Sequence, residues 1–164
     1  SGFFNSTEGD RVYDATDFAA YFGSLVSNGV FYMTATNLQV SPVIGLAVSV
    51  AAGSAWINGY RYENTGDLNI TLTTANGSNP RIDRIVVRLS QISRSIQIAV
   101  VDGTPAATPV APALTRTSDI YELGIADVLV PTAATSIVSN NIMDTRMNTS
   151  LCGLVNSLVS AVYE

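Results

Sequence analysis

The sequence predicts a mainly β protein: an antiparallel β-sandwich or partial barrel flanked by an N-terminal helix and a C-terminal helix. Through most of residues 37–130, hydrophobic and polar residues alternate with a period of two, as in strands that bury one face. Glycine and proline interrupt these runs at short intervals, which is typical of turns between strands. By contrast, one segment near each end of the chain repeats its hydrophobic residues with the 3–4 spacing of an amphipathic helix.

The chain has 164 residues, and this length favours a single domain over residues 1–164 with a core that needs no disulfide or metal. An N-terminal arm and helix occupy residues 1–36. A β-rich core follows over residues 37–147, and the second helix takes residues 148–164.

The first helix is expected over about residues 15–27. Asp14 is an N-cap residue type, and Asp17 three positions later completes a capping box with aspartate in place of glutamate. Asn28-Gly29 is a typical helix stop. The hydrophobic residues lie on one helical face, which we interpret as core-facing. They are Phe18, Tyr21, Phe22, Leu25 and Val26.

The first half of the β-rich core is built of short alternating runs. Strands are expected around Leu38–Val40 and residues 46–50, and again over residues 68–72. Asn58-Gly59 stands between two β-prone runs and predicts a two-residue type I′ turn that joins strands near 54–57 and 60–63, because both turn positions require positive φ.

The second half of the core contains the longest strands. Residues 82–89 and 96–100 predict a hairpin around a turn at 91–93, and residues 120–130 predict a strand with a bulge near Ala126-Asp127. Residues 103–118 contain three prolines and predict an extended connection that cannot join a ladder. A loop of this length usually wraps a neighbour or makes an interface.

The last helix is expected over about residues 150–163, with N-cap residues at 148–150. Its hydrophobic stripe either packs on the sheet of its own chain or forms an interface between copies, and we favour the copies. No helix stop follows the hydrophobic 3–4 spacing before the sequence reaches Glu164. We therefore expect the helix to continue into a downstream region absent from this sequence. The candidate interface residues are Leu151, Leu154, Val155, Leu158, Val159 and Val162.

The composition narrows the function classes. The chain has no histidine and no lysine, and all eight of its cations are arginine. This composition excludes catalysis through histidine and metal sites bound by histidine. It also excludes Schiff-base lysines and P-loop lysines. We expect no enzyme activity, no catalytic residues, no cofactor and no metal. The net charge of −5 disfavours nucleic acid and anionic membranes as partners, and no hydrophobic run is long enough to span a membrane.

Three charged or polar features have ordinary structural explanations. The cluster of Arg81, Asp83, Arg84 and Arg88 predicts a set of cross-strand ion pairs at the sheet edge, with an anion site as the alternative. Asp144-Thr145-Arg146 predicts a turn with a salt bridge. The single cysteine, Cys152, lies among hydrophobic residues and is interpreted as a small buried residue.

Aromatic residues gather around the Asn58-Gly59 turn. Trp56, Tyr60 and Tyr62 are a candidate glycan-stacking platform. Aromatic side chains on a hairpin also pack across strands in ordinary sheets, and this second interpretation is the stronger one.

Eight short segments occur in a distinctive order. They are SGFFNS at 1–6, GDRVY at 9–13, NPRIDRIVVR at 79–88, Gly-Thr-Pro at 103–105, ALTR at 113–116, YEL at 121–123, NIMDTR at 141–146 and LCG at 151–153. In this order and spacing the chain resembles the N-terminal module of tail and baseplate structural proteins from phages and prophages of Gram-positive bacteria.

The resemblance implies a non-enzymatic virion module that anchors a receptor-binding or fibre portion to the tail tip. It also implies a homotrimer, other tail or baseplate proteins as partners, contact with host cell-wall saccharide through a downstream region, and a location in the virion after synthesis in the bacterial cytoplasm. The alternative function is a carbohydrate-binding module that itself contacts host cell-wall glycans.

Overall fold

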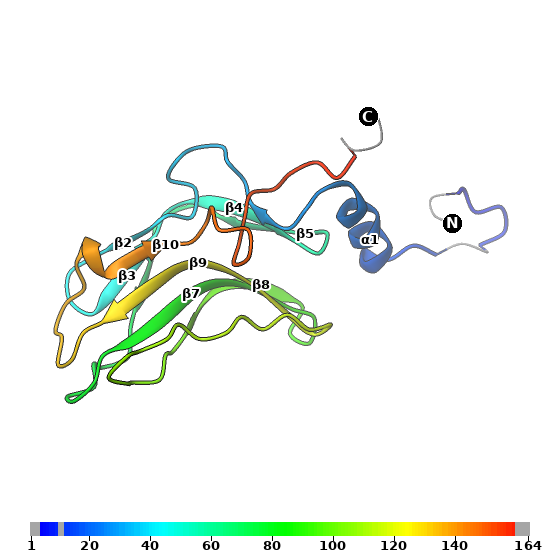
Figure 1. Ribbon diagram of the computed structural model, residues 1–164. Coiled ribbons are helices and arrows are strands. Elements are labelled where there is room, and N and C mark those ends of the chain that lie inside the picture. The colour runs from blue at the N-terminus through cyan, green and yellow to red at the C-terminus, as the bar shows by residue number, and fades with distance from the viewer. Residues whose placement is uncertain (1–3, 10–11, 160–164) are drawn as a thin grey trace.

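A computed structural model describes residues 4–9 and 12–159, and Figure 1 shows its arrangement. The elements in chain order are the helix α1 (Ala15–Leu25), the strands β1 (Gly29–Val30), β2 (Val40–Pro42), β3 (Ala47–Val50), β4 (Gly53–Ile57), β5 (Tyr60–Asn64), β6 (Leu68–Thr71), β7 (Arg81–Ser90), β8 (Ser95–Val101) and β9 (Ile120–Val130), the 3-10 helix η1 (Ser139–Asn141) and the strand β10 (Ile142–Asp144).

The strands form three antiparallel sheets, in the orders β1-β4-β5, β2-β3-β6 and β10-β9-β7-β8. The long strands of the third sheet make one layer, and the first two sheets lie over it (Figure 1). Fully buried side chains from both layers meet between them, among them Val48 of β3, Ile57 of β4, Ile85 of β7 and Leu123 of β9. The prediction of a mainly β, sandwich-like protein is confirmed.

The β7–β8 hairpin and its neighbour β9 follow the predicted alternation. Val87 pairs with Ile98 on one side and Leu123 on the other. The register of β7 and β9 shifts where Ile85 faces Ala126 and Val86 faces Gly124, so the bulge lies at Ile125, one residue before its predicted position. The bulge explains why the sequence alternation slips there.

The β4–β5 hairpin forms as predicted. Asn58 and Gly59 have φ of 49° and 84°, and Ile57 pairs with Tyr60 across the turn. The turn also supports α1, because a Cβ built on Gly59 would lie 1.9 Å from the carbonyl oxygen of Ala19. Glycine is therefore required at this position both for its φ and for its contact with the helix.

The helix α1 begins and is capped as predicted. The Asp14 side chain accepts hydrogen bonds from the backbone N–H groups of Thr16 and Asp17, and the Asp17 carboxylate accepts one from the N–H of Asp14. The interpretation of its aromatic face as core-facing is wrong, since Ala19 is the buried residue of the helix. The helix lies beside the end of the β4–β5 hairpin rather than across a sheet (Figure 1).

The predicted C-terminal helix is wrong for the described part of the segment, residues 150–159. Residues 150–152 close a turn begun at Asn148, and the following residues run extended beside residues 25–30, with bridges between Val30 and Leu154 and between Val26 and Ser157. Gly153 has a φ of 83°, which a right-handed helix cannot contain. Backbone hydrogen bonds to residues 25–30 take the place of the hydrogen bonds that a helix would form. The hydrophobic residues of the segment therefore do not lie on one helical face. Val162 lies outside the described residues.

The connection over residues 103–118 is extended, as predicted, and lies along the outer face of its own sheet (Figure 1). The Arg84 guanidinium donates to the Pro112 carbonyl at 2.6 Å, and the Thr115 N–H donates to the Glu122 carboxylate at 2.7 Å. The loop therefore covers β7 and β9 of its own chain. Within the described part of the chain, no helix is long and apolar enough to cross a membrane.

Candidate functional site

Two cross-strand ion pairs join β7 to β9. Arg84 lies opposite Asp127, and its guanidinium donates to both carboxylate oxygens of Asp127 in a bidentate pair, at 2.6 and 2.8 Å. Arg88 lies opposite Glu122, and its guanidinium is 2.6 Å from the Glu122 carboxylate. The prediction of cross-strand pairs is confirmed for these residues. Their predicted place at the sheet edge is wrong, since β7 is an inner strand of the order β10-β9-β7-β8.

Arg81 and Asp83 form a third pair at 2.8 Å along β7, and both side chains are buried. Arg81 also donates to the carbonyls of Thr73 and Thr74, and Asp83 accepts the N–H of Gly103. The cluster thus joins two loops to the sheet. Its charges are occupied by partners of the same chain, so it does not form the anion site that was the alternative interpretation.

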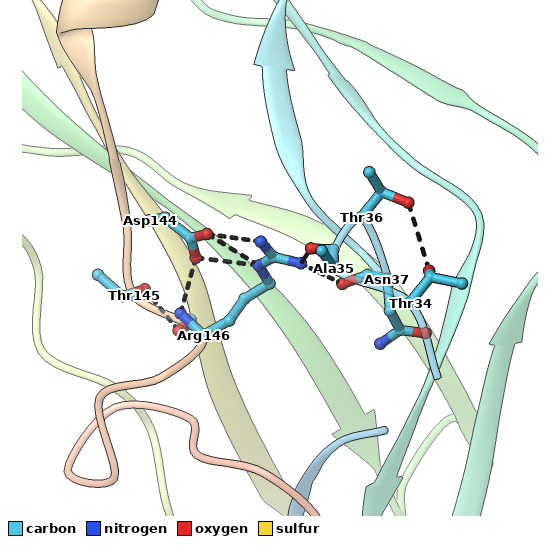
Figure 2. A network of polar contacts seen from close by, with 8 residues as sticks. Thr34, Ala35, Thr36, Asn37, Asp144, Thr145 and Arg146 are labelled. Atoms are coloured by element: carbon cyan, nitrogen blue, oxygen red, sulfur yellow. Dashed lines mark hydrogen bonds and ion pairs between the residues drawn. The ribbon is translucent and has the colours of Figure 1, made fainter. Parts of the chain in front are cut away.

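Arg146 connects the end of β10 to the loop before β2 (Figure 2). Its guanidinium binds the Asp144 carboxylate at 2.6 Å and donates to the carbonyls of Ala35 and Asn37 at 3.0 and 2.6 Å. The Asp144 carboxylate also accepts the Arg146 N–H, which confirms the predicted turn with a salt bridge. The hydrogen bonds from Arg146 hold the pKa of Asp144 below its usual value.

Cys152 is buried and unpaired, as interpreted from the sequence. Burial raises the pKa of its thiol to about 12. A thiol with this pKa stays protonated at neutral pH and is a poor nucleophile. Its setting therefore fits a packing role.

The structure does not bring the three aromatic residues of the candidate glycan platform together. Trp56 pairs with Arg61 on one face of the β4–β5 hairpin, where its ring meets those of Phe22 and Phe31 edge-on. Tyr60 and Tyr62 lie on the opposite face and pack against the core. The two tyrosines line one cavity of the described chain, and Trp56 is not among its lining residues.

That cavity is an open groove of about 850 Å³ between β5, the first turn of α1 and the tip of the β7–β8 hairpin. Its walls carry carboxylates, guanidinium groups and tyrosine rings. The lining residues from β5 are Tyr60, Arg61, Tyr62 and Glu63, and the β7–β8 hairpin adds Leu89, Gln91, Arg94, Ser95 and Ile96. The sequence pattern missed this groove, since residues from three separate segments build it.

A second exposed feature is hydrophobic. It comprises exposed residues of α1 and of the C-terminal segment, and the two segments meet where the Leu158 N–H donates to the Leu25 carbonyl at 2.8 Å. We call this set the terminal surface: Phe18, Tyr21, Phe22, Leu158 and Val159, with exposed fractions of 38–50%. Leu151, Leu154 and Val155, the other described members of the predicted interface, are only partly exposed.

Among the described residues, no group of three or more histidine, cysteine, aspartate or glutamate side chains is placed to hold a metal ion. The comparisons likewise assign no class to the protein: no family model, no curated protein and no solved structure matches the chain.

Proposed function

We propose that this protein is a non-enzymatic structural module of a phage tail or baseplate, and that it anchors a receptor-binding or fibre portion by binding another tail protein through the terminal surface. The observation that carries the attachment is the exposure of Phe18, Tyr21 and Phe22 on a helix that buries one residue. The tail assignment rests on the resemblance of the eight sequence segments.

The terminal surface fits a protein partner better than a small ligand. It combines aromatic and aliphatic side chains that are 38–50% exposed, and α1 stands at one end of the sheets (Figure 1). Exposed hydrophobic residues occur elsewhere too, such as Val12, Met33 and Ile44, but those of the terminal surface include three aromatic rings from one helix. A hydrophobic patch on a protein surface marks an interaction site. Aromatic side chains are also the residues that contribute most to binding between proteins.

The virion assignment is tested by immunogold electron microscopy of phage particles released by the host strain, with antibody raised against this chain. Label at the tail tip is the expected result. Particles that carry the intact tail but no label would overturn the assignment, and label on the capsid would move the protein to another part of the virion.

The attachment is tested by changing Phe18 and Leu158 together to serine in the phage. We expect particles that lack this protein while the variant chain still folds. The matched control is Ile44→Ser, which changes a fully exposed hydrophobic residue at the β2–β3 turn. If the double variant enters particles as well as the control does, the terminal surface is not the attachment site.

The carbohydrate-binding alternative keeps one supporting observation, the two tyrosines that line the groove. A glycan array with the purified chain separates the two functions. Binding that is lost in Tyr60→Ala and kept in Trp56→Phe would favour the alternative. The homotrimer implied by the resemblance stays a prediction. Its expected interface was the C-terminal helix, which does not form over the described residues 150–159, so a trimer and the dimer proposed below are competing outcomes for the state in solution.

A further inference from the structure

We propose that two copies of this chain pair through β5, antiparallel across a two-fold axis at Tyr62, with Arg61 of each copy opposite Glu63 of the other. The inference goes beyond the proposed function, because it concerns the contact between copies and uses an edge of the sheet separate from the terminal surface.

The first observation is that β5 has an open outer edge. It is the last strand of the sheet β1-β4-β5. In a hairpin with a two-residue turn the pair next to the turn, Ile57 and Tyr60, exchanges both hydrogen bonds, so Tyr60, Tyr62 and Asn64 direct their backbone groups toward β4. The N–H and C=O groups of the alternate residues, Arg61 and Glu63, therefore point away from β4.

No other strand of the described chain pairs with this edge. Over residues 4–9 and 12–159, no backbone hydrogen bond reaches the main chain of Arg61 or Glu63 from outside the hairpin. The four consecutive residues 60–63 line the open groove, whose other walls are the first turn of α1 and the tip of the β7–β8 hairpin. An unpaired edge strand is a template for another strand.

The second observation is that the edge is complementary to itself. Arg61 and Glu63 carry opposite charges two positions apart, and both side chains are about half exposed. When two such edges pair antiparallel around Tyr62, each arginine lies directly opposite the glutamate of the other copy. These same residues carry the outward backbone groups, so they form the two hydrogen-bonded pairs, with the two Tyr62 residues as the closer, non-hydrogen-bonded pair between them.

The opposite charges of Arg61 and Glu63 also argue against the interpretation that these residues only prevent the edge of β5 from pairing. Charged side chains on an edge strand often serve to prevent pairing, and like charges directly opposite each other repel a second copy. Here one cation and one anion attract it, at a register that also matches the hydrogen bonds. The present Arg61–Glu63 pair within one strand, at 3.0 Å, would be exchanged for two pairs between copies. A two-fold contact of this kind is closed and forms a dimer rather than a fibre.

The experiment exploits the symmetry. In Arg61→Glu the edge carries two glutamates, and in Glu63→Arg it carries two arginines, so like charges oppose each other in either homodimer. We expect sedimentation equilibrium to show a wild-type dimer and self-association at least about tenfold weaker in each variant. An equimolar mixture of the two variants is expected to recover the dimer as a heterodimer.

A backbone substitution provides an independent measurement. Glu63→Pro removes an outward N–H that the monomer does not use, whereas Glu63→Ala keeps it. We expect the proline variant to associate more weakly than the alanine variant, with both monomers folded by circular dichroism. A wild-type monomer, an oligomer unaffected by either charge reversal, or a mixture that stays monomeric would each overturn the inference. The incorporation of the protein into phage particles can succeed in any of these cases, so the failures are distinguishable.

Discussion

Two regions of the molecule differ in which side chains they bury. One is the sheet of β7, β8 and β9, and the other is the α1 end, by which we mean α1 and the terminal surface. The sheet buries charged groups and gives each a partner, as in the pair of Arg84 and Asp127, whose side chains are 8% and 6% exposed. The α1 end leaves large hydrophobic residues such as Phe18 half exposed. The sheet thus satisfies its charged groups within one chain, whereas the α1 end keeps large hydrophobic side chains partly exposed.

The largest expected effect lies in the sheet. Arg84→Met leaves the Asp127 carboxylate buried without its partner, and we expect a loss of about 3–5 kcal/mol in the free energy of unfolding, measured by urea denaturation. The double variant Arg84→Met with Asp127→Leu removes both charges and should recover most of the loss. A single variant as stable as the wild type would show that the pair does not support the sheet.

The next effect lies where the hairpin meets α1. Gly59→Val forces a β-branched residue to positive φ, at about 1–2 kcal/mol, and drives its Cβ into Ala19, at about 1–3 kcal/mol more. We expect thermal unfolding to show the summed loss. Gly66→Ala is the matched control, since a Cβ there meets nothing within 4 Å. Equal stability of the two variants would mean that α1 does not rest on the turn.

A smaller effect concerns pH in the buried interior. Because burial raises the pKa of Cys152 to about 12, the native chain keeps a proton that the unfolded chain loses above its ordinary pKa. Stability from this thiol is therefore full below that ordinary value and lost as the pH rises toward 12. Between pH 8 and pH 10 we expect a loss of about 1.5–2 kcal/mol in urea denaturation that Cys152→Ala does not show. An identical slope in both proteins would contradict the raised pKa.

The smallest effect belongs to the α1 end. Leu158→Ser changes a half-exposed residue of the terminal surface, and we expect its free energy of unfolding to stay within about 0.5 kcal/mol of the wild type. Leu154→Ser, in the same segment but packed on the core, should be clearly less stable. Equal losses would mean that the terminal surface is part of the folding core and would weaken the contrast between the two regions.

The two segments with helical spacing show how far the sequence pattern carries. The segment of α1 contains its own start signal, the reciprocal hydrogen bonds of Asp14 and Asp17, and it folds as predicted. The segment after Ser150 has equally regular spacing, but β-branched valines and a glycine at positive φ weaken its helical preference. Backbone groups of residues 25–30 then bind it as an extended chain. Regular spacing therefore predicted neither the burial of the aromatic residues of α1 nor the conformation of the last segment, since both depend on long-range partners.

The candidate sites divide in the same way. The ion pairs of β7 could be expected from charges spaced along a strand, since Arg84 and Arg88 stand four residues apart and share one face. Their inner position could not, because the order of strands depends on which distant segments pair. The groove beside β5 and the terminal surface were beyond prediction for the same reason.

Local sequence was sufficient to predict the strand-rich class, the Asn58-Gly59 turn and the cap of α1, because each depends on side chains within a few residues of one another. It was not sufficient for three other features: that β7 is an inner strand, that Trp56 lies on the opposite face from Tyr60 and Tyr62, and that the last segment is extended. These features depend on contacts between residues far apart in the chain, and their free energies come from pairing and burial that a local pattern does not contain.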